Sequence, residues 1–581
     1  METLLKRYFG YDKFRPLQLE IIEHILKKRD TLVLMPTGGG KSICYQIPAL
    51  KFDGLTLVIS PLISLMKDQV DGLKTNGINA EYINSSLSFK EIINIKDKVQ
   101  RKEIKILYLA PERLALENFK EFLKTLQISL IAIDEAHCIS EWGHDFRPEY
   151  RNLKFLKKIF PEIPIIALTA TATKRVREDI LKQLSLTNPR VFISSFNRKN
   201  LNLIIMEKKN AFNKILNLLK KYKDESAIIY CFSRKDTEKI AQQLNESGFK
   251  ALPYHAGLSN DIRKQNQEVF IKDKVNVIVA TIAFGMGINK LDVRLIIHCT
   301  FPKSIEGYYQ EIGRAGRDGL QSDCVLFYSK GDKRKHEFFI DQIQDEVIRN
   351  NALDKLNKMM IYCEDESCRR KNILRYFGET FLEHNCNGCD ICLKISELEE
   401  VTEPGKDINK ILSLFPNRLE NEFSSEKSRE LFEKLRILRK DIANQRNVPS
   451  FIIFNDVSLH EMSYYLPKNN EEFLKINGVG QQKLKDFGDL FLEAINNHVK
   501  ENNIIPEKRG MIKDNLKTDY HKKLERIKEK FSNAYESWKE EEDDKLRNLY
   551  SQNNPINEIS KILKRQPNAI KSRLKKFGLL S

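Results

Sequence analysis

Short apolar runs alternate with longer amphipathic stretches over the first 340 residues of the chain. Runs of this kind that end in polar turns predict buried strands, and their alternation with helical stretches predicts a mostly parallel sheet. The clearest runs span residues 55–60, 104–109, 129–133 and 165–168. Further runs at 227–231 and 277–280 predict a second sheet of the same kind. The pattern therefore predicts two consecutive α/β lobes.

An apolar strand leads into a glycine loop and a Lys-Ser pair in the sequence TLVLMPTGGGKS, which begins at Thr31. Glycines let backbone N–H groups converge on phosphates, Lys41 supplies a charge near the β- and γ-phosphates, and Ser42 offers a hydroxyl to Mg²⁺. Met35 replaces the first glycine of the GxxxxGK[ST] pattern, but the flanking strand and helix support the interpretation. The predicted ATP-binding loop comprises Thr37, Gly38, Gly39, Gly40, Lys41 and Ser42.

Two carboxylates follow the apolar run 129–133 directly. Asp134 and Glu135 are therefore expected at the carboxyl edge of the sheet, where α/β folds bind ligands. Asp134 is expected to hold Mg²⁺ together with Ser42, and Glu135 to orient or deprotonate the attacking water.

A loop crowded with aromatic and cationic side chains comes next: Trp142, His144, Phe146, Arg147 and Tyr150. Aromatic faces interleaved with cations suit single-stranded nucleic acid, where each base stack contributes about 1–3 kcal/mol. An ordinary amphipathic loop after an acidic turn is the alternative. The phosphate-binding loop upstream favours the functional interpretation.

The segment YYQEIGRAGRDG (308–319) carries two arginines, Arg314 and Arg317, among three glycines. Glycine costs about 1 kcal/mol in a helix interior, so helix propensity does not explain this composition. Arginine donors on a tight backbone suit the γ-phosphate of ATP, approached from across a cleft. The two lobes are thus expected to clamp ATP between them.

Together these motifs resemble superfamily 2 helicases, and specifically the RecQ family of DNA helicases. The upstream segment YFGYDKFRPLQ (8–18) and the aromatic-rich loop are the RecQ-like signatures. The resemblance implies that Gln18 reads the adenine edge while Tyr11 and Arg15 sandwich its ring. A guanidinium and a phenol can stack on a base, and an amide can pair with adenine.

The same resemblance implies that Gln310 joins Arg314 and Arg317 in the last motif, with Arg317 as the arginine finger. It implies an ATP- and Mg²⁺-dependent DNA helicase that moves 3′ to 5′ and serves recombination and repair. An RNA helicase, a translocase that strips proteins without unwinding, and a non-catalytic DNA-binding scaffold are the alternatives. The intact phosphate loop and acidic pair argue against the scaffold.

Four cysteines with the spacing C-x17-C-x2-C-x2-C follow the second lobe: Cys368, Cys386, Cys389 and Cys392. Four thiolates close a tetrahedron around Zn²⁺ and leave no open position, which predicts a structural site. RecQ proteins carry a similar module. Cys363 and His384 are alternative ligands for one position, and a redox C-x2-C pair is the remaining alternative.

In long RecQ-like proteins a winged-helix domain follows the zinc module and helps to split the duplex. Here fewer than forty residues, largely charged, separate Cys392 from the next helical segment. The strand-separating wing is therefore expected to be absent. Residues 428–500 show apolar positions at helical spacing and resemble an HRDC domain, an auxiliary DNA-binding module. A structural or protein-contact domain is the alternative.

The C-terminal 48 residues resemble a Myb-like helix-turn-helix, with Trp538 expected in its core. Its third helix would be the recognition helix in a DNA groove. A three-helix bundle that binds protein is the alternative. The basic positions of that helix are Lys571, Arg573, Lys575 and Lys576.

The composition agrees with this assignment. A net charge of +17 and a pI near 9.1 favour a polyanionic partner, expected to be single-stranded and duplex DNA. The absence of a long apolar run and of a signal-peptide core predicts no membrane partner and a cytoplasmic, nucleoid-associated location. Ten cysteines with four clustered fit a reducing compartment and one metal site. Protein partners are not predicted.

The expected fold is α/β, with two tandem RecA-like motor lobes, a small four-cysteine zinc module and all-α accessory domains. The cofactors expected are ATP, Mg²⁺ and Zn²⁺. The expected boundaries are 1–205 for the first lobe, 206–340 for the second, 341–400 for the zinc module, 401–427 for a linker, 428–500 for the HRDC-like domain, 501–533 for a charged linker and 534–581 for the helix-turn-helix.

Overall fold

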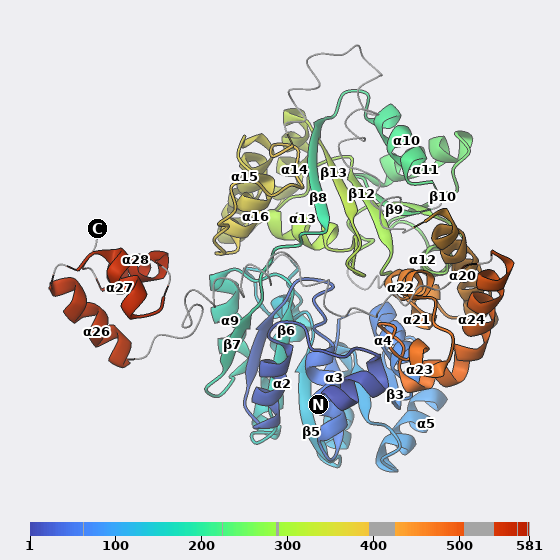
Figure 1. Cartoon of the computed structure of the whole chain (residues 1–581), viewed down its shortest axis with the longest axis horizontal. Coiled ribbons are helices and arrows are strands. Elements are labelled where there is room, and N and C mark those ends of the chain that lie inside the picture. Colours follow the sequence, from blue (N-terminus) through green and yellow to red (C-terminus); the bar gives the residue numbers. More distant parts are fainter. Residues whose placement is uncertain are drawn as a thin grey trace. The chain divides into compact units, whose positions relative to one another are not determined.

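The computed structural model divides into two compact units, Met1–Ile504 and Ile505–Ser581 (Figure 1). It describes residues 1–61, 63–143, 145–223, 225–285, 290–393, 425–502, 504, 540–552, 554–565, 567–577 and 579. Within those ranges, none of the helices combines the length and the apolar character that a membrane span requires.

The first lobe is built on a seven-stranded parallel sheet in the order β3-β4-β2-β5-β6-β1-β7. Most of its strand residues are buried, because helices cover both faces, as parallel sheets require. The strands are β1 (Thr31–Leu34), β2 (Leu55–Ile59), β3 (Ala80–Ile83), β4 (Ile106–Leu109), β5 (Ile128–Ile133), β6 (Ile165–Thr169) and β7 (Arg190–Ile193). The main helices are α2 (Gln18–Leu26), α3 (Ile43–Lys51), α4 (Ile63–Thr75), α5 (Phe89–Gln100), α6 (Glu117–Lys124), α8 (Lys154–Ile159) and α9 (Lys174–Leu184).

The strand order of this sheet places the two expected catalytic segments side by side. β6 lies between β5 and β1 and pairs with both in parallel. The loops that leave β1 and β5 therefore emerge at the same carboxyl edge, separated by one strand. This is where open parallel sheets bind ligands.

The second lobe is a six-stranded parallel sheet in the order β10-β11-β9-β12-β13-β8. Its strands are β8 (Leu201–Glu207), β9 (Ser226–Tyr230), β10 (Ala251–Tyr254), β11 (Val277–Ala280), β12 (Val293–His298) and β13 (Ser322–Tyr328). Its helices are α10 (Ala211–Lys221), α11 (Arg234–Glu246), α12 (Asn260–Ile271) and α13 (Ile305–Ile312). The expected boundary at residue 205 falls inside β8, which pairs with β13 along its whole length. The second lobe therefore begins at Leu201, and residues 194–200 connect the lobes.

The zinc module follows as α14 (Lys333–Ile340), α15 (Glu346–Glu364), α16 (Arg369–Tyr376) and a loop that runs to residue 393. The loop packs on the edge of the second sheet, where Leu203 of β8 forms a parallel bridge with Cys389. Apolar side chains of α15 and α16 join the same core as those of both lobes. The module is thus a part of the motor body.

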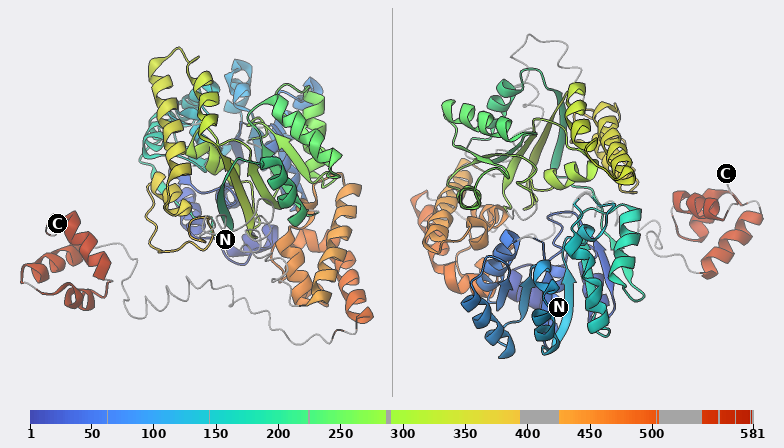
Figure 2. Two further views of the ribbon diagram at one scale, coloured as in Figure 1. Left: turned by 90° about the horizontal axis from the view of Figure 1, so that it is seen from above. Right: turned by 180° about the vertical axis from the view of Figure 1, so that it is seen from behind.

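The HRDC-like domain consists of five helices and contacts both lobes (Figures 1 and 2). Phe454 is completely buried at its centre. The turn at 477–480 packs on the N-terminal segment, where Gly478 N donates to Gly10 O at 3.2 Å. A Cβ on Gly10, which has φ +74°, would lie 2.4 Å from Val479 N, so this contact requires glycine. The helices are α20 (Glu426–Gln445), α21 (Ser450–Ile453), α22 (Asp456–Tyr465), α23 (Asn470–Phe473) and α24 (Gln481–Glu501).

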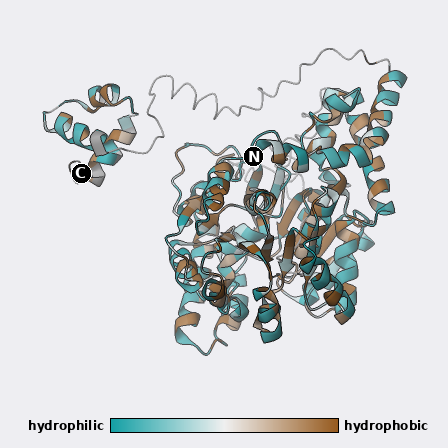
Figure 3. Ribbon diagram, turned by 90° about the horizontal axis from the view of Figure 1, so that it is seen from below, coloured by the Kyte–Doolittle hydropathy of each residue, from teal (hydrophilic) through white to brown (hydrophobic). Residues whose placement is uncertain are grey.

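The C-terminal unit contains the three expected helices, α26 (Glu540–Ser551), α27 (Ile556–Ile562) and α28 (Pro567–Lys576). Trp538, expected in its core, lies outside the described residues. Arg573, one of the basic positions of the expected recognition helix, forms a bidentate ion pair with Asp543 of α26. The core consists of Leu546, Ile559, Leu563, Ile570 and Leu574. Figure 3 shows hydrophobic residues along the strands of the sheets, whereas the helices carry both hydrophobic and hydrophilic residues.

Candidate active site

The phosphate-binding loop joins β1 to α3, as the sequence predicts. Lys41 Nζ donates to Met35 O at 3.2 Å, and burial lowers the pKa of Lys41 while Glu135 and Asp134 raise it. A Cβ on Gly40, which has φ +83°, would lie 2.5 Å from Gln18 Nε2. The Gln18 side chain could move away, but φ +83° is a conformation that residues with a Cβ rarely adopt, so the backbone favours glycine here.

The acidic motif lies at the end of β5, within the same sheet edge. Burial and the adjacent Glu135 raise the pKa of Asp134 to about 6. Glu135 has φ +49°, a left-handed conformation that costs a residue with a Cβ about 1–3 kcal/mol and that concentrates at functional sites. His137, which the sequence did not single out, contacts two residues through Nδ1. The Glu135 carboxylate lies 3.3 Å away and the Thr169 hydroxyl 2.9 Å away. His137 thereby ties the acidic motif to the end of β6.

The donor set at this edge fits a divalent cation. The partly buried carboxylate of Asp134 is disfavoured by the charge of Glu135, and a bound cation would relieve that repulsion. Ser42 and Asp134 line the same cavity. Hydroxyl and carboxylate oxygens are ligands that Mg²⁺ accepts in nucleotide sites.

The arginine motif of the second lobe, residues 308–319, lies directly against the phosphate-binding loop. A Cβ built on Gly38 would lie 3.3 Å from Arg317 Cα. Burial, with Arg314 and Arg198 nearby, lowers the pKa of Arg317 to about 9. Because a guanidinium keeps its proton in proteins, the direction of this shift means that burial disfavours the charge and that an adjacent anion would stabilise it. The expected γ-phosphate is such an anion.

The residues expected to bind adenine lie at the entrance of the phosphate-binding loop. Gln18 is buried and its Nε2 donates to Gly40 O at 2.9 Å, while Arg15 N donates to Gln18 Oε1 at 2.8 Å. The Arg15 guanidinium donates to Gly38 O. In this arrangement Gln18 and Arg15 are hydrogen-bonded to carbonyl oxygens of the phosphate-binding loop. Binding of a base by these side chains would require them to release those carbonyls.

One cavity of about 580 Å³ contains all of these groups and falls within the size range of small-molecule sites. The expected site residues that line it are Tyr11, Arg15, Gln18, Thr37, Gly38, Gly40, Lys41, Ser42, Asp134, Glu135, Gln310, Arg314 and Arg317. Among the residues expected to bind or hydrolyse ATP, Gly39 alone is not part of its wall. Sequence reasoning missed the contribution of the HRDC-like domain, which supplies Phe451, Ile452, Asn455, Val457, Asn477 and Lys483.

The C-terminal part of the aromatic-rich loop is held by side-chain contacts to the first lobe. Arg147 donates to Pro61 O at 3.1 Å and pairs with Asp145. Tyr150, expected as a stacking face, is completely buried, and its hydroxyl donates to Asp134 O at 3.0 Å. That expectation for Tyr150 is therefore wrong, because the ring is a core residue beneath the acidic motif.

The middle of the loop carries the remaining stacking candidates. Trp142 is partly exposed, with the Arg175 guanidinium 3.1 Å from its ring centroid. Lys355 of α15 donates to Trp142 O at 2.9 Å. Phe146 is partly exposed beneath Arg151, and His144 lies outside the described residues. The loop thus rests on the zinc-module helix α15, a contact that its sequence did not predict.

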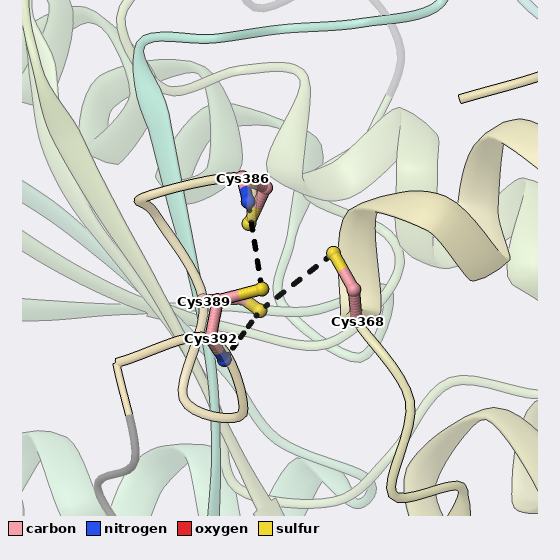
Figure 4. A group of neighbouring side chains, drawn as sticks. All are labelled: Cys368, Cys386, Cys389 and Cys392. Carbon is pink, nitrogen blue, oxygen red and sulfur yellow. Dashed lines mark hydrogen bonds between the residues drawn. The ribbon is translucent and has the colours of Figure 1, made fainter. Parts of the chain in front are cut away.

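The four cysteines expected to bind zinc lie together (Figure 4). Cys368 precedes α16, and the other three come from the loop 386–392. Their sulfur atoms all lie within 4.8 Å of one another, and those of Cys368 and Cys389 are 4.0 Å apart. A tetrahedral Zn²⁺ with bonds of about 2.3 Å needs sulfurs about 3.8 Å apart. The cluster therefore fits zinc, and among the described residues neither Cys363 nor His384 belongs to it.

Replacing Cys389 with serine should remove bound zinc and lower the thermal midpoint of unfolding. Cys389 is fully buried and bridges to Leu203 of β8, so the loss should also disturb the second lobe. Zinc content by atomic absorption and a thermal melt measure both effects. The matched control is Cys363→Ser, which alters a buried thiol outside the cluster and should keep one zinc per chain. Zinc loss in the control alone would contradict the ligand set.

Family models match four parts of the chain. They describe a DEAD/DEAH box helicase at residues 15–180, a helicase conserved C-terminal domain at 207–319, RecQ zinc-binding at 330–393 and an HRDC domain at 428–495. These matches cover both lobes, the zinc module and the five-helix domain. The zinc-binding match ends one residue after Cys392, and the HRDC match begins 35 residues later.

Curated relatives extend the similarity over most of the chain. A protein of Pasteurella multocida called ATP-dependent DNA helicase RecQ is 40% identical over 86% of this chain and 94% of its own length. A protein of Bacillus subtilis with the same description is 40% identical over 85% of this chain and 98% of its own length. A mimivirus protein called a putative ATP-dependent RNA helicase is 44% identical over 72% of this chain and 78% of its own length. The chain therefore belongs to the RecQ family of helicases.

Proposed function

We propose that this protein is an ATP-dependent DNA helicase that translocates 3′ to 5′ on one strand and unwinds duplex DNA in recombination and repair. Family membership supports the activity, since two relatives carry that description over most of their length. The observation that carries the mechanism is the hydrogen bond from the Tyr150 hydroxyl to Asp134 O. It joins the end of the aromatic-rich loop to the main chain of the residue whose carboxylate is expected to serve hydrolysis.

ATP binding closes the cleft through charges contributed by both lobes. Lys41 lies on the first lobe and Arg317 on the second, and both line one cavity. Asp134 and Ser42 would hold Mg²⁺, which supplies charge neutralisation at the phosphate oxygens when bound. Glu135 orients the attacking water. Loss of the γ-phosphate removes the anion that Arg317 contacts, so the cleft reopens and the strand advances.

Replacing Trp142 with alanine should leave basal ATP hydrolysis within a few-fold of wild type and remove most of its stimulation by single-stranded DNA. The ring is the largest partly exposed aromatic side chain among the described residues of the loop, and base stacking contributes about 1–3 kcal/mol. Steady-state hydrolysis with and without oligonucleotide measures the ratio. Phe89→Ala, at an exposed aromatic on α5, is the matched control. Full stimulation in the Trp142 variant would refute the coupling role.

An RNA helicase is the second candidate, because the mimivirus relative is described as one. Stimulation of ATP hydrolysis by single-stranded DNA and by RNA of the same sequence separates the two. We expect DNA to stimulate at lower concentration and to a higher rate. Equal or stronger stimulation by RNA would favour the alternative.

The mechanism also requires a contact to duplex DNA that a winged-helix domain would otherwise supply. The alignment with the Pasteurella protein runs over 593 residues although this chain has 581, so the relative contains residues with no counterpart here. We propose that the C-terminal three-helix unit supplies duplex contacts in place of a wing. Its third helix carries Lys571, Lys575 and Lys576. Arg573 is not proposed as a duplex contact, because its guanidinium pairs with Asp543.

Deleting residues 534–581 should therefore weaken binding to duplex DNA by about tenfold while leaving binding to single strands unchanged. Each lost phosphate contact lowers affinity and flattens its salt dependence. Fluorescence anisotropy over a salt series measures both quantities. Unchanged duplex affinity in the truncated protein would contradict the assignment and favour a protein-binding bundle.

A DNA substrate also supports a location with the nucleoid in the cytoplasm.

A further inference from the structure

The connector between the two lobes carries a guanidinium that reaches both sides of the cleft. Arg198 Nη1 donates to Thr37 O of the phosphate-binding loop at 2.6 Å. Arg198 Nη2 donates to Ala315 O at 2.9 Å and to Gly316 O at 2.8 Å. Those two carbonyls lie in the arginine motif, between Arg314 and Arg317. One side chain therefore joins the backbones of the two segments that must meet across ATP.

The contact depends on the shape of the guanidinium. A planar fork can donate to acceptors on different segments at once, whereas a lysine ammonium is a compact point charge. Burial lowers the pKa of Arg198, and the carbonyl oxygens around it offset the cost of burying the charge. Asn200 supports the same corner, since its Nδ2 donates to Gly316 O at 2.8 Å and to Leu320 O at 2.9 Å.

The zinc module holds the connector from the other side. Arg370, two residues after Cys368, donates to Arg198 O at 2.5 Å and to Leu201 O at 2.6 Å. Phe196 of the connector stacks on Phe377 with ring centroids 4.6 Å apart. The connector is thus held against the zinc module on one side, while the Arg198 side chain reaches the cleft on the other.

We infer that Arg198 is a positioning residue for ATP hydrolysis, which sets the register between the phosphate-binding loop and the arginine motif and so places Arg317 at the γ-phosphate. The inference rests on the proposed ATPase function. Arg198 is not among the residues that line the cavity, whereas Gly38, Gly40 and Lys41 are. Its removal therefore affects the rate more than the affinity.

Arg198→Ala is expected to lower kcat for DNA-stimulated ATP hydrolysis by about 10- to 100-fold, because misplacing a catalytic group by about 1 Å can cost 10²-fold. The dissociation constant for a fluorescent ATP analogue should stay within about threefold of wild type. Arg198→Lys keeps the charge but loses the fork, and should show a similar loss of kcat. The matched control is Arg190→Ala on β7, which removes a mostly exposed guanidinium.

A double-mutant cycle with Arg317 separates positioning from general structural damage. If Arg198 acts through Arg317, adding Arg198→Ala to Arg317→Ala should cost less than about threefold in single-turnover hydrolysis. Thermal melts and zinc content show whether each variant is folded and metal-loaded.

Two results would overturn the inference. The first is an unchanged kcat in Arg198→Lys and Arg198→Ala. The second is an equal loss from Arg198→Ala in the wild-type and Arg317→Ala backgrounds, which would mean independent effects. Absence of DNA-stimulated hydrolysis by the wild-type chain in the same assay would contradict the proposed function itself, so the two failures are distinguishable.

Discussion

Replacing Arg317 with alanine is expected to lower kcat for DNA-stimulated ATP hydrolysis by about 10³-fold or more, while ATP affinity changes only a few-fold. An arginine finger contributes about 10³–10⁵ to kcat because it stabilises charge that develops at the γ-phosphate during transfer. Arg317 fits that role: it lines the nucleotide cavity and its backbone touches the phosphate-binding loop. Single-turnover hydrolysis with saturating oligonucleotide measures the rate, and analogue binding measures the affinity.

The control for this prediction is Arg317→Lys, which restores a charge without the planar fork. It should recover a minor part of the lost rate, because a point charge can approach one phosphate oxygen but cannot bridge two. A rate in Arg317→Ala within tenfold of wild type would show that another group stabilises the transition state. Arg314 would then be the next candidate, since it lines the same cavity.

Replacing Lys41 with alanine should reduce ATP hydrolysis to background, a loss of at least about 10²- to 10³-fold, and should weaken ATP binding as well. Lys41 differs from Arg317 in this second effect, because it is expected to contact the phosphates in the ground state and the transition state alike. Burial lowers the pKa of its ammonium group, so an anion beside it would offset the cost of burying the charge.

The matched control is Lys51→Ala at the end of α3, nine residues from the end of the phosphate-binding loop, where the lysine is exposed. Its kinetics should equal those of wild type. Steady-state hydrolysis and analogue binding measured on both variants check the prediction. Near-normal hydrolysis in the Lys41 variant would overturn the assignment of the phosphate-binding loop.

Local patterns predicted the parts of the site that depend on side-chain chemistry at fixed spacing. The phosphate-binding loop between a strand and a helix, Asp134 at the end of a buried strand, and the four zinc cysteines all lie where the sequence placed them. Each signal is contained within a few residues or in a short spacing rule. The start of the second lobe was harder to predict from the sequence, because β8 is an edge strand whose partner, β13, lies over a hundred residues later in the chain.

Contacts that use the main chain left no signature in the sequence. Arg198 donates to carbonyl oxygens, which every residue has, so no pattern at positions 37, 315 and 316 could reveal its partners. The stacking role predicted for Tyr150 is wrong because composition does not distinguish a buried ring from an exposed one. The HRDC-like domain reaches the nucleotide cavity through tertiary packing, which a helical pattern does not specify.

The proposed function requires that this two-lobed motor opens DNA although its chain has no room for a winged helix between the zinc module and the HRDC-like domain. The decisive measurement is strand displacement by the full chain, with ATP and Mg²⁺, on duplexes that carry a 3′ or a 5′ single-stranded tail. We predict displacement of the 3′-tailed duplex, little displacement of the 5′-tailed one, and none with Lys41→Ala. DNA-stimulated ATP hydrolysis without displacement of either duplex would refute the proposed unwinding and would identify a translocase that does not unwind.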